Sequence, residues 1–185
     1  MRGELLVALA CCACRMSEAD EPIGLVVNDL SAFDAANLEE AARCWNLEFG
    51  TQLVMGAADQ QVEVFYDEFT CTHGAAAQVQ NGWPMRLAVC PQQYWPEDLT
   101  ATQTPFRVLS HELGHVLNIL GHPADPLATM MGGGTSGYEM FRPADREMFF
   151  GANPDFVGVD ACAGRVIRWM RPPPEDDIGH CNCEP

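Results

Sequence analysis

The order of apolar and polar residues in the first half of the chain predicts three β-strands. Residues 23–27 form a continuous apolar run, which indicates a buried strand. Residues 61–66 alternate between polar and apolar side chains, as expected for a half-exposed strand. Residues 85–90 predict a third strand, and the intervening segment 70–82 is expected to be a loop.

Helical spacing of apolar residues follows the first strand and returns near the C-terminal end. Residues 34–49 predict an amphipathic helix with Asp34 as its N-cap and Gly50 as its stop signal. Residues 143–151 predict a last helix, and the chain after it is expected to be an irregular tail. Together with a helix over the middle of the chain, this order predicts an α+β fold, a twisted mixed sheet covered by helices.

Length and composition favour a single catalytic domain with a short tail. The 185 residues are 48% hydrophobic, which suits a globular chain with its own core. We place the domain at 23–160 and a Cys/Pro-rich tail at 161–185. A formal net charge of -16 argues against nucleic acid and anionic membrane surfaces as partners, because both need a basic face. A monomer is expected.

The N-terminal segment has the order of a signal peptide. A signal peptide is predicted over residues 1–16, because residues 1–14 contain one basic residue, Arg2, and then an apolar run that ends in small residues and is too short to anchor a protein in a bilayer. A buried N-terminal helix or strand is the alternative. Cys11, Cys12 and Cys14 also leave open a lipoprotein-type leader. The predicted location is therefore secreted, extracellular or in the cell envelope.

Six of the nine cysteines lie outside this segment. An even number in an exported chain indicates disulfides, although six cysteines allow fifteen pairings and the sequence cannot choose among them. A second zinc site around Cys181 and Cys183, next to His180, is the weaker alternative because a second Cys-x-x-Cys pair is missing.

The stretch after residue 104 holds the main candidate chemistry. Thr104 as N-cap and Pro105 at the first helical position predict a helix that runs to about residue 118 or 120. His111 and His115 are four residues apart, so both imidazoles lie on one helix face and can bind one zinc ion. Glu112 can reach a water on that metal and act as a base, which is the chemistry of the H-E-x-x-H motif.

A third histidine follows within the same twelve residues. Gly121 allows a sharp turn that would return His122 to the metal. Downstream come Met130 and Met131, in a segment that is expected to turn. The predicted metal ligands are therefore His111, His115 and His122.

These motifs resemble the metzincin zinc endopeptidases, and most closely the matrix-metalloprotease type (matrixins). That clan carries H-E-x-x-H-x-x-G-x-x-H followed by a methionine turn. After His122 this chain continues with Asp125-Pro, Ala128 and Met130 at the spacing typical of matrixins, and the segment 141–151 resembles their last helix. The resemblance is strong over 104–151 and general over 23–100.

The resemblance implies a zincin-like fold with a zinc cleft between an upper and a lower subdomain. It also implies a zinc endopeptidase with a protein or peptide substrate, in which Glu112 takes a proton from a zinc-activated water. Met130 would underlie the metal site, or Met131 would hold that place instead. Calcium sites are compatible with an acidic chain of this kind, although no calcium-binding motif is visible.

One departure from the family pattern concerns the third ligand. Asn118 stands at the family's glycine position, and His122 falls one residue late. Asparagine tolerates a left-handed turn, so the helix can end at Asn118; otherwise it runs on and Gly121 makes the turn. Asp125 is the fallback ligand, and a more distant acidic residue, Glu139 or Glu147, is the weaker alternative.

Two other functions stay open at this stage. A catalytically inactive zincin fold could serve as a binding or adhesion module, although the intact His111, Glu112 and His115 speak against it. A small exported zinc-binding protein without a cleft is the third possibility, and the strand pattern of 61–90 gives it no support.

Overall fold

A computed structural model gives the architecture of the chain. It describes residues 21–72, 75–82, 84–95, 104–125, 128–131, 141–156, 167–170 and 180–183. The N-terminal segment 1–16, for which a signal peptide is predicted, lies outside the described residues. In the described part of the chain, no helix is both long enough and apolar enough to cross a bilayer.

The centre of the fold is a five-stranded mixed sheet with the order β2-β1-β3-β5-β4. Four strands run parallel, and the edge strand β4 pairs antiparallel with β5. The predicted α+β class and the three predicted strands are confirmed. The strands are β1 (Ile23–Asn28), β2 (Leu53–Met55), β3 (Gln60–Tyr66), β4 (Ala77–Gln80) and β5 (Met85–Val89).

Helix α1 (Ala32–Phe49) makes the crossover between the parallel strands β1 and β2. The prediction that Asp34 caps this helix is wrong by three residues: Ser31 is the N-cap, and its hydroxyl accepts a hydrogen bond from the Asp34 N–H at 3.0 Å. Asp34 lies inside the first turn, where the negative charge of an acidic side chain interacts favourably with the helix dipole. The predicted stop at Gly50 is confirmed, since its φ of 72° is left-handed.

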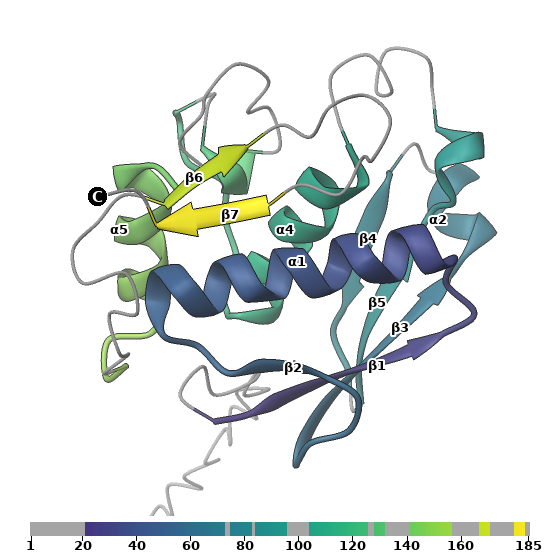
Figure 1. The fold of residues 1–185 in the computed structure, drawn as a ribbon, viewed down its shortest axis with the longest axis horizontal. Helices are drawn as coiled ribbons and strands as arrows, with labels where there is room; N and C mark the ends of the chain where they lie inside the picture. The colour runs from purple at the N-terminus through teal and green to yellow at the C-terminus, as the bar shows by residue number, and fades with distance from the viewer. Residues whose placement is uncertain are drawn as a thin grey trace, which may run out of the picture.

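Two further helices pack with α1: α4 (Pro105–Val116) lies between α1 and the sheet edge, and α5 (Pro143–Ala152) lies beyond the sheet at the C-terminal end of α1 (Figure 1). Helix α4 has Thr104 as its N-cap and Pro105 in its first turn, as predicted, and it packs against α1 and β4. Helix α5 confirms the predicted last helix. An aromatic cluster joins α1 to α5 and to the segment just before α5, and its members are Trp45, Phe49, Phe141 and Phe149.

Several short elements were not predicted. The segment 70–82, expected to be a loop, contains the end of α2 (Glu68–Thr72) and the edge strand β4. The region expected to be an irregular tail contains a hairpin of β6 (Ile167–Met170) and β7 (His180–Cys183), which lies against α1 on the side away from β1 and β2 (Figure 1). All of these elements have five residues or fewer, too few for a periodic pattern to emerge.

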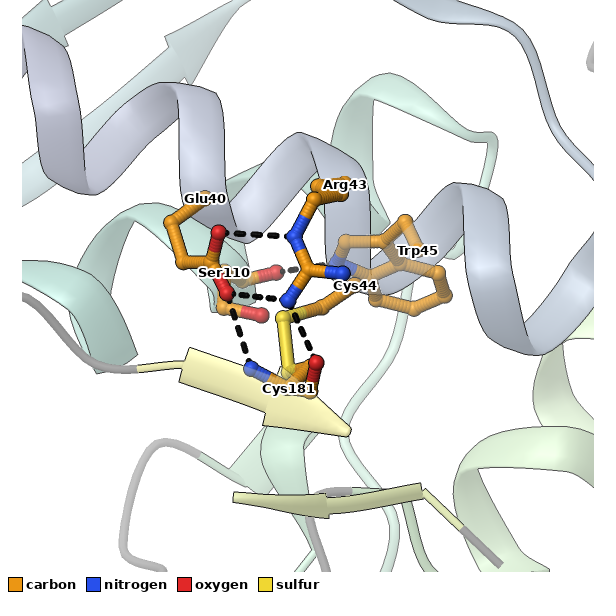
Figure 2. Close-up of a disulfide and its surroundings, with 6 residues drawn as sticks. All are labelled: Glu40, Arg43, Cys44, Trp45, Ser110 and Cys181. Carbon is orange, nitrogen blue, oxygen red and sulfur yellow. Dashed lines mark hydrogen bonds and ion pairs between the residues drawn. A yellow bond between two sulfur atoms is a disulfide. The ribbon is translucent and has the colours of Figure 1, made fainter. Parts of the chain in front are cut away.

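Two disulfides hold these short elements in place, as the even cysteine count suggested. Cys71–Cys90 ties α2 to the end of β5, and Cys44–Cys181 ties α1 to β7 across 137 residues. Figure 2 shows the surroundings of the second bond. The Glu40 carboxylate accepts the Cys181 N–H at 2.8 Å, and Arg43 donates to the Cys181 carbonyl. Side chains of α1 thus pair with both backbone groups of Cys181.

Candidate metal centre

Helix α4 brings the first two candidate ligands together. His111 and His115 are one turn apart on the same face, and their Nε2 atoms are 3.1 Å apart. The opposite face of the helix is apolar and buried, so the helix cannot rotate without exposing its core residues. On that face Trp45 of α1 donates from its indole to the carbonyl of Ser110 at 2.8 Å, next to the first ligand (Figure 2).

The turn after α4 returns the third histidine. The helix ends at Val116, and Asn118 has a φ of 70°, so the left-handed residue is Asn118 and not Gly121. The Asn118 N–H donates to the His115 carbonyl at 3.1 Å, and the Ile119 N–H donates to the Gly114 carbonyl at 3.0 Å. These two bonds define a Schellman motif, in which asparagine takes the place of the usual glycine. His122 then lies with its Nε2 3.3 Å from that of His111.

Backbone carbonyls fix the tautomers of the two helical histidines. His111 Nδ1 faces the Thr129 carbonyl at 3.1 Å, and His115 Nδ1 faces the Ile119 carbonyl at 2.5 Å. A carbonyl only accepts, so each Nδ1 carries the hydrogen and each Nε2 presents a lone pair. Lone pairs that converge at this distance repel one another unless a cation lies between them.

The proton affinities of the site favour such a cation over protons. The pKa of His111 is lowered to about 4, mainly by burial; the bond to the Thr129 carbonyl opposes this shift, and the neighbouring His115 and His122 add to it. Burial also lowers the pKa of His115. Both rings are therefore neutral at physiological pH, which is the form that binds metals.

The spacing of the imidazoles fits zinc. In a tetrahedral site with Zn–N bonds of about 2.0–2.1 Å, the ligand nitrogens are about 3.3 Å apart. The two closest pairs here are separated by 3.1 and 3.3 Å, and all three ligand atoms lie within 4.8 Å of one another. The three predicted ligands thus form a group that can hold one metal ion.

The alternative ligands are arranged differently. Asp125 is turned to Arg142, the N-cap residue of α5, whose Nε is 3.3 Å from the Asp125 carboxylate, and Asp125 is not part of the histidine group. Glu147 is exposed on α5 and is not part of it either. Glu139 lies outside the described residues. So do the two remaining histidines, His73 and the side chain of His180.

Glu112 lies beside the metal ligands in a nearly closed environment. Its side-chain Oε1 is 4.0 Å from His111 Nε2, and the residue is 7% exposed. Burial raises the pKa of Glu112 to about 7, although the Val79 N–H of β4 donates to its Oε2 at 3.1 Å and opposes that rise. A carboxyl group with this pKa can both accept and release a proton near neutral pH.

A buried methionine forms the floor of the site. Met130 is fully buried, and a Cβ placed on Gly114 would lie 2.0 Å from its sulfur, so the two residues are in close contact between the ligand positions of α4. Of the two methionines predicted for this place, Met130 is the one for which the structure describes a contact with Gly114. The side chain of Met131 lies outside the described residues.

One carboxylate, for which the sequence predicts no role, holds this floor. Asp145, fully buried on α5, accepts hydrogen bonds from the N–H groups of Thr129 at 3.0 Å and Met130 at 2.8 Å. It also accepts the Arg142 N–H at 2.8 Å. The available signal was an acidic residue two positions after Pro143, where helix N-termini favour a carboxylate.

Two further contributors were also missed. Val79 holds Glu112 from the edge strand, and the alternation in Ala77-Gln-Val-Gln80 was the only sign of a strand there. Asn153 contacts the turn after α4, and nothing in the sequence distinguishes it from a surface asparagine.

The described residues contain one other group that could hold a metal, formed by Glu40, Cys44 and Cys181. Its two sulfurs are joined in the disulfide described above, which leaves no thiolate for a metal. Among the described residues no group of three carboxylates lies close enough together to share an ion, and calcium binding stays an expectation.

Comparisons with known proteins add no assignment to this geometry. No protein-family model matches the chain, and a search of curated proteins gave no match either.

Proposed function

We propose that the protein is a zinc-dependent metalloendopeptidase. The observation that carries the proposal is the convergence of three imidazole nitrogens beside a buried carboxyl group. His111, His115 and His122 would hold the ion, and the donor set of three neutral imidazoles suits a catalytic zinc that keeps one position open.

When bound, zinc supplies Lewis acidity and makes a coordinated water acidic. Glu112 then acts as the base. Its carboxylate takes a proton from the water as the water oxygen bonds to the peptide carbonyl carbon. When the C–N bond breaks, the same group delivers that proton to the leaving amine nitrogen. A pKa of about 7 for Glu112 supports both halves of this shuttle.

The sheet edge supports a peptide as the substrate. Strand β4 is an edge strand of the sheet, and its residue Val79 contacts Glu112. The Val79 N–H is taken by Glu112, but an edge strand can bond to an extended peptide through its other outward backbone groups, and such a peptide would lie beside Glu112 and the imidazoles. A peptide bond held there is within reach of the base.

The wider proposal follows the family resemblance. A metzincin of the matrixin type, with a zincin-like cleft between its subdomains, is supported by the motif, by the buried Met130 below the ligands and by α4 packed on a mixed sheet. Secretion or a location in the cell envelope is supported by the two disulfides, since such bonds persist in oxidising compartments.

Replacement of Glu112 by Gln tests the proposal. The wild-type protein should cleave casein or gelatin, and a chelator should abolish the cleavage. Glu112→Gln should bind one zinc per chain as the wild type does, because the glutamate is not a ligand, and should lose cleavage by about two orders of magnitude or more.

Two results would overturn the assignment. Wild-type activity that survives complete removal of zinc would exclude a metalloprotease, and cleavage that survives in Glu112→Gln would exclude this residue as the base. Zinc binding without any cleavage by the wild type would favour the inactive binding module instead.

A further inference from the structure

Asn153 makes contacts that link the last helix to the metal centre. It is 8% exposed at the C-terminal end of α5. Its Nδ2 donates to the carbonyl of Leu117 at 2.9 Å and to that of Phe149 at 3.0 Å. Since two acceptors face this atom, the amide orientation is determined, and Oδ1 faces the turn, where it accepts from Asn118 Nδ2 at 3.2 Å.

These contacts hold the turn that ends α4. The last carbonyls of a helix lack intrahelical partners, and the Schellman bonds here use those of Gly114 and His115. The carbonyl of Leu117 is left for Asn153. The next residue, Asn118, needs its left-handed conformation fixed without the freedom of glycine, and its side chain is bonded to the same amide.

The turn acts directly on one ligand. The Ile119 carbonyl, immediately after Asn118, faces Nδ1 of His115 and so determines which nitrogen of that ring is unprotonated. The same turn begins the short segment that returns His122 to His111. A shift of residues 117–119 would therefore change the orientation of one ligand and the position of another.

We infer that Asn153 is a positioning residue for the metal centre, and that it acts on His115 and His122 through the turn at residues 117–119. The inference rests on the proposed zinc site and extends it to a residue that touches neither metal nor substrate. It also accounts for the departure from the family pattern, because the Asn118–Asn153 pair stabilises a turn for which the family uses glycine.

The test compares Asn153→Ala with a matched variant, Asn46→Ala. Asn46 also uses its amide to hold the turn after a helix, since Nδ2 donates to the Leu53 carbonyl at 2.8 Å and Oδ1 accepts the Leu53 N–H at 2.8 Å. That turn leads into β2, away from the histidines. Both variants lose a comparable set of bonds, so a general loss of stability should be similar in both.

Two readouts separate positioning from stability. The first is zinc affinity by competition with a chelator, and the second is the tautomer of His115 in the zinc-free protein from ring ¹⁵N chemical shifts. Asn153→Ala should bind zinc on the order of tenfold more weakly than Asn46→Ala, and its His115 should lose the single Nδ1-protonated form. Asn46→Ala should match the wild type in both.

Equal zinc affinity and equal His115 tautomers in the two variants would overturn the inference. If Asn153→Ala does not fold, Asn153→Asp is measured in its place, because it keeps an acceptor for Asn118 and removes the donor to Leu117. A wild type that binds zinc without cleaving protein would contradict the proposed function and leave this inference standing. A wild type with no zinc affinity would contradict both.

Discussion

The surroundings of the His111 ring change its pKa strongly. Because burial lowers this pKa to about 4, we expect the ring in the zinc-free protein to stay neutral, with the hydrogen on Nδ1, at any pH well above that value. Ring ¹⁵N shifts recorded during a pH titration check this. A midpoint near the ordinary value of 6.5 would show that the ring is not buried against Thr129 as described.

Gly114 is a position where even a small side chain is expected to lower stability. A methyl group there would meet the Met130 sulfur at 2.0 Å and a Trp45 ring carbon at 3.1 Å. We expect Gly114→Ala to lower the free energy of unfolding by about 1–3 kcal/mol, since overpacking displaces the floor of the site. Gly151 is the control, because an added Cβ has no neighbour within 4 Å there. Gly151→Ala should leave stability unchanged or raise it; equal losses in both would contradict the close contact.

At this scale the sequence predicted the histidines that the structure brings together, but not the residues that orient them. His111, His115 and Glu112 follow from one helical motif, because spacing within a helix determines which side chains share a face. His122 depends on a turn whose two alternatives could not be separated without the φ of Asn118. Val79, Asp145 and Asn153 act through tertiary contacts that no local pattern reveals: Val79 uses only its backbone N–H, and Asp and Asn are common on any surface.

Among the elements, α5 supports the site although it carries none of the candidate ligands. The carboxylate of Asp145 accepts N–H groups from the segment that contains Met130, so α5 holds the floor below α4. We expect Asp145→Asn to cost about 1–3 kcal/mol of stability, because an amide cannot accept all of these donors and leaves one unpaired. Chemical denaturation measures this, with the exposed Asp155→Asn as the control. A loss no larger than that of the control would contradict the role of Asp145.

The elements that could be predicted are those with enough residues for a period to appear. Helices α1, α4 and α5 and strands β1, β3 and β5 all met this condition. Strand β4 is only four residues long, with polar residues at alternate positions. Its pairing with β5 therefore decides its conformation. The hairpin β6–β7 is held to α1 by a covalent bond between cysteines whose pairing no local pattern reveals.

On the scale of the whole molecule, the two disulfides close loops of very different length. Cys44–Cys181 spans 137 residues and Cys71–Cys90 spans 19. In the chain-entropy model the longer loop contributes more, by about 1–2 kcal/mol. Replacing Cys44 and Cys181 by Ala should therefore lower the unfolding free energy more than replacing Cys71 and Cys90. The reverse order in denaturant titrations would show that the hairpin adds little to the fold.

The central claim is that three imidazoles from one helix and the turn after it hold a single metal ion. Zinc content per chain, measured after dialysis against a competing chelator in the wild type and in His122→Ala, tests it most directly. The account predicts about one zinc per chain in the wild type and a loss of most of it in His122→Ala, because two ligands on a helix bind far more weakly than three. Zinc retained by His122→Ala at the wild-type level, or a wild type without zinc, would contradict it.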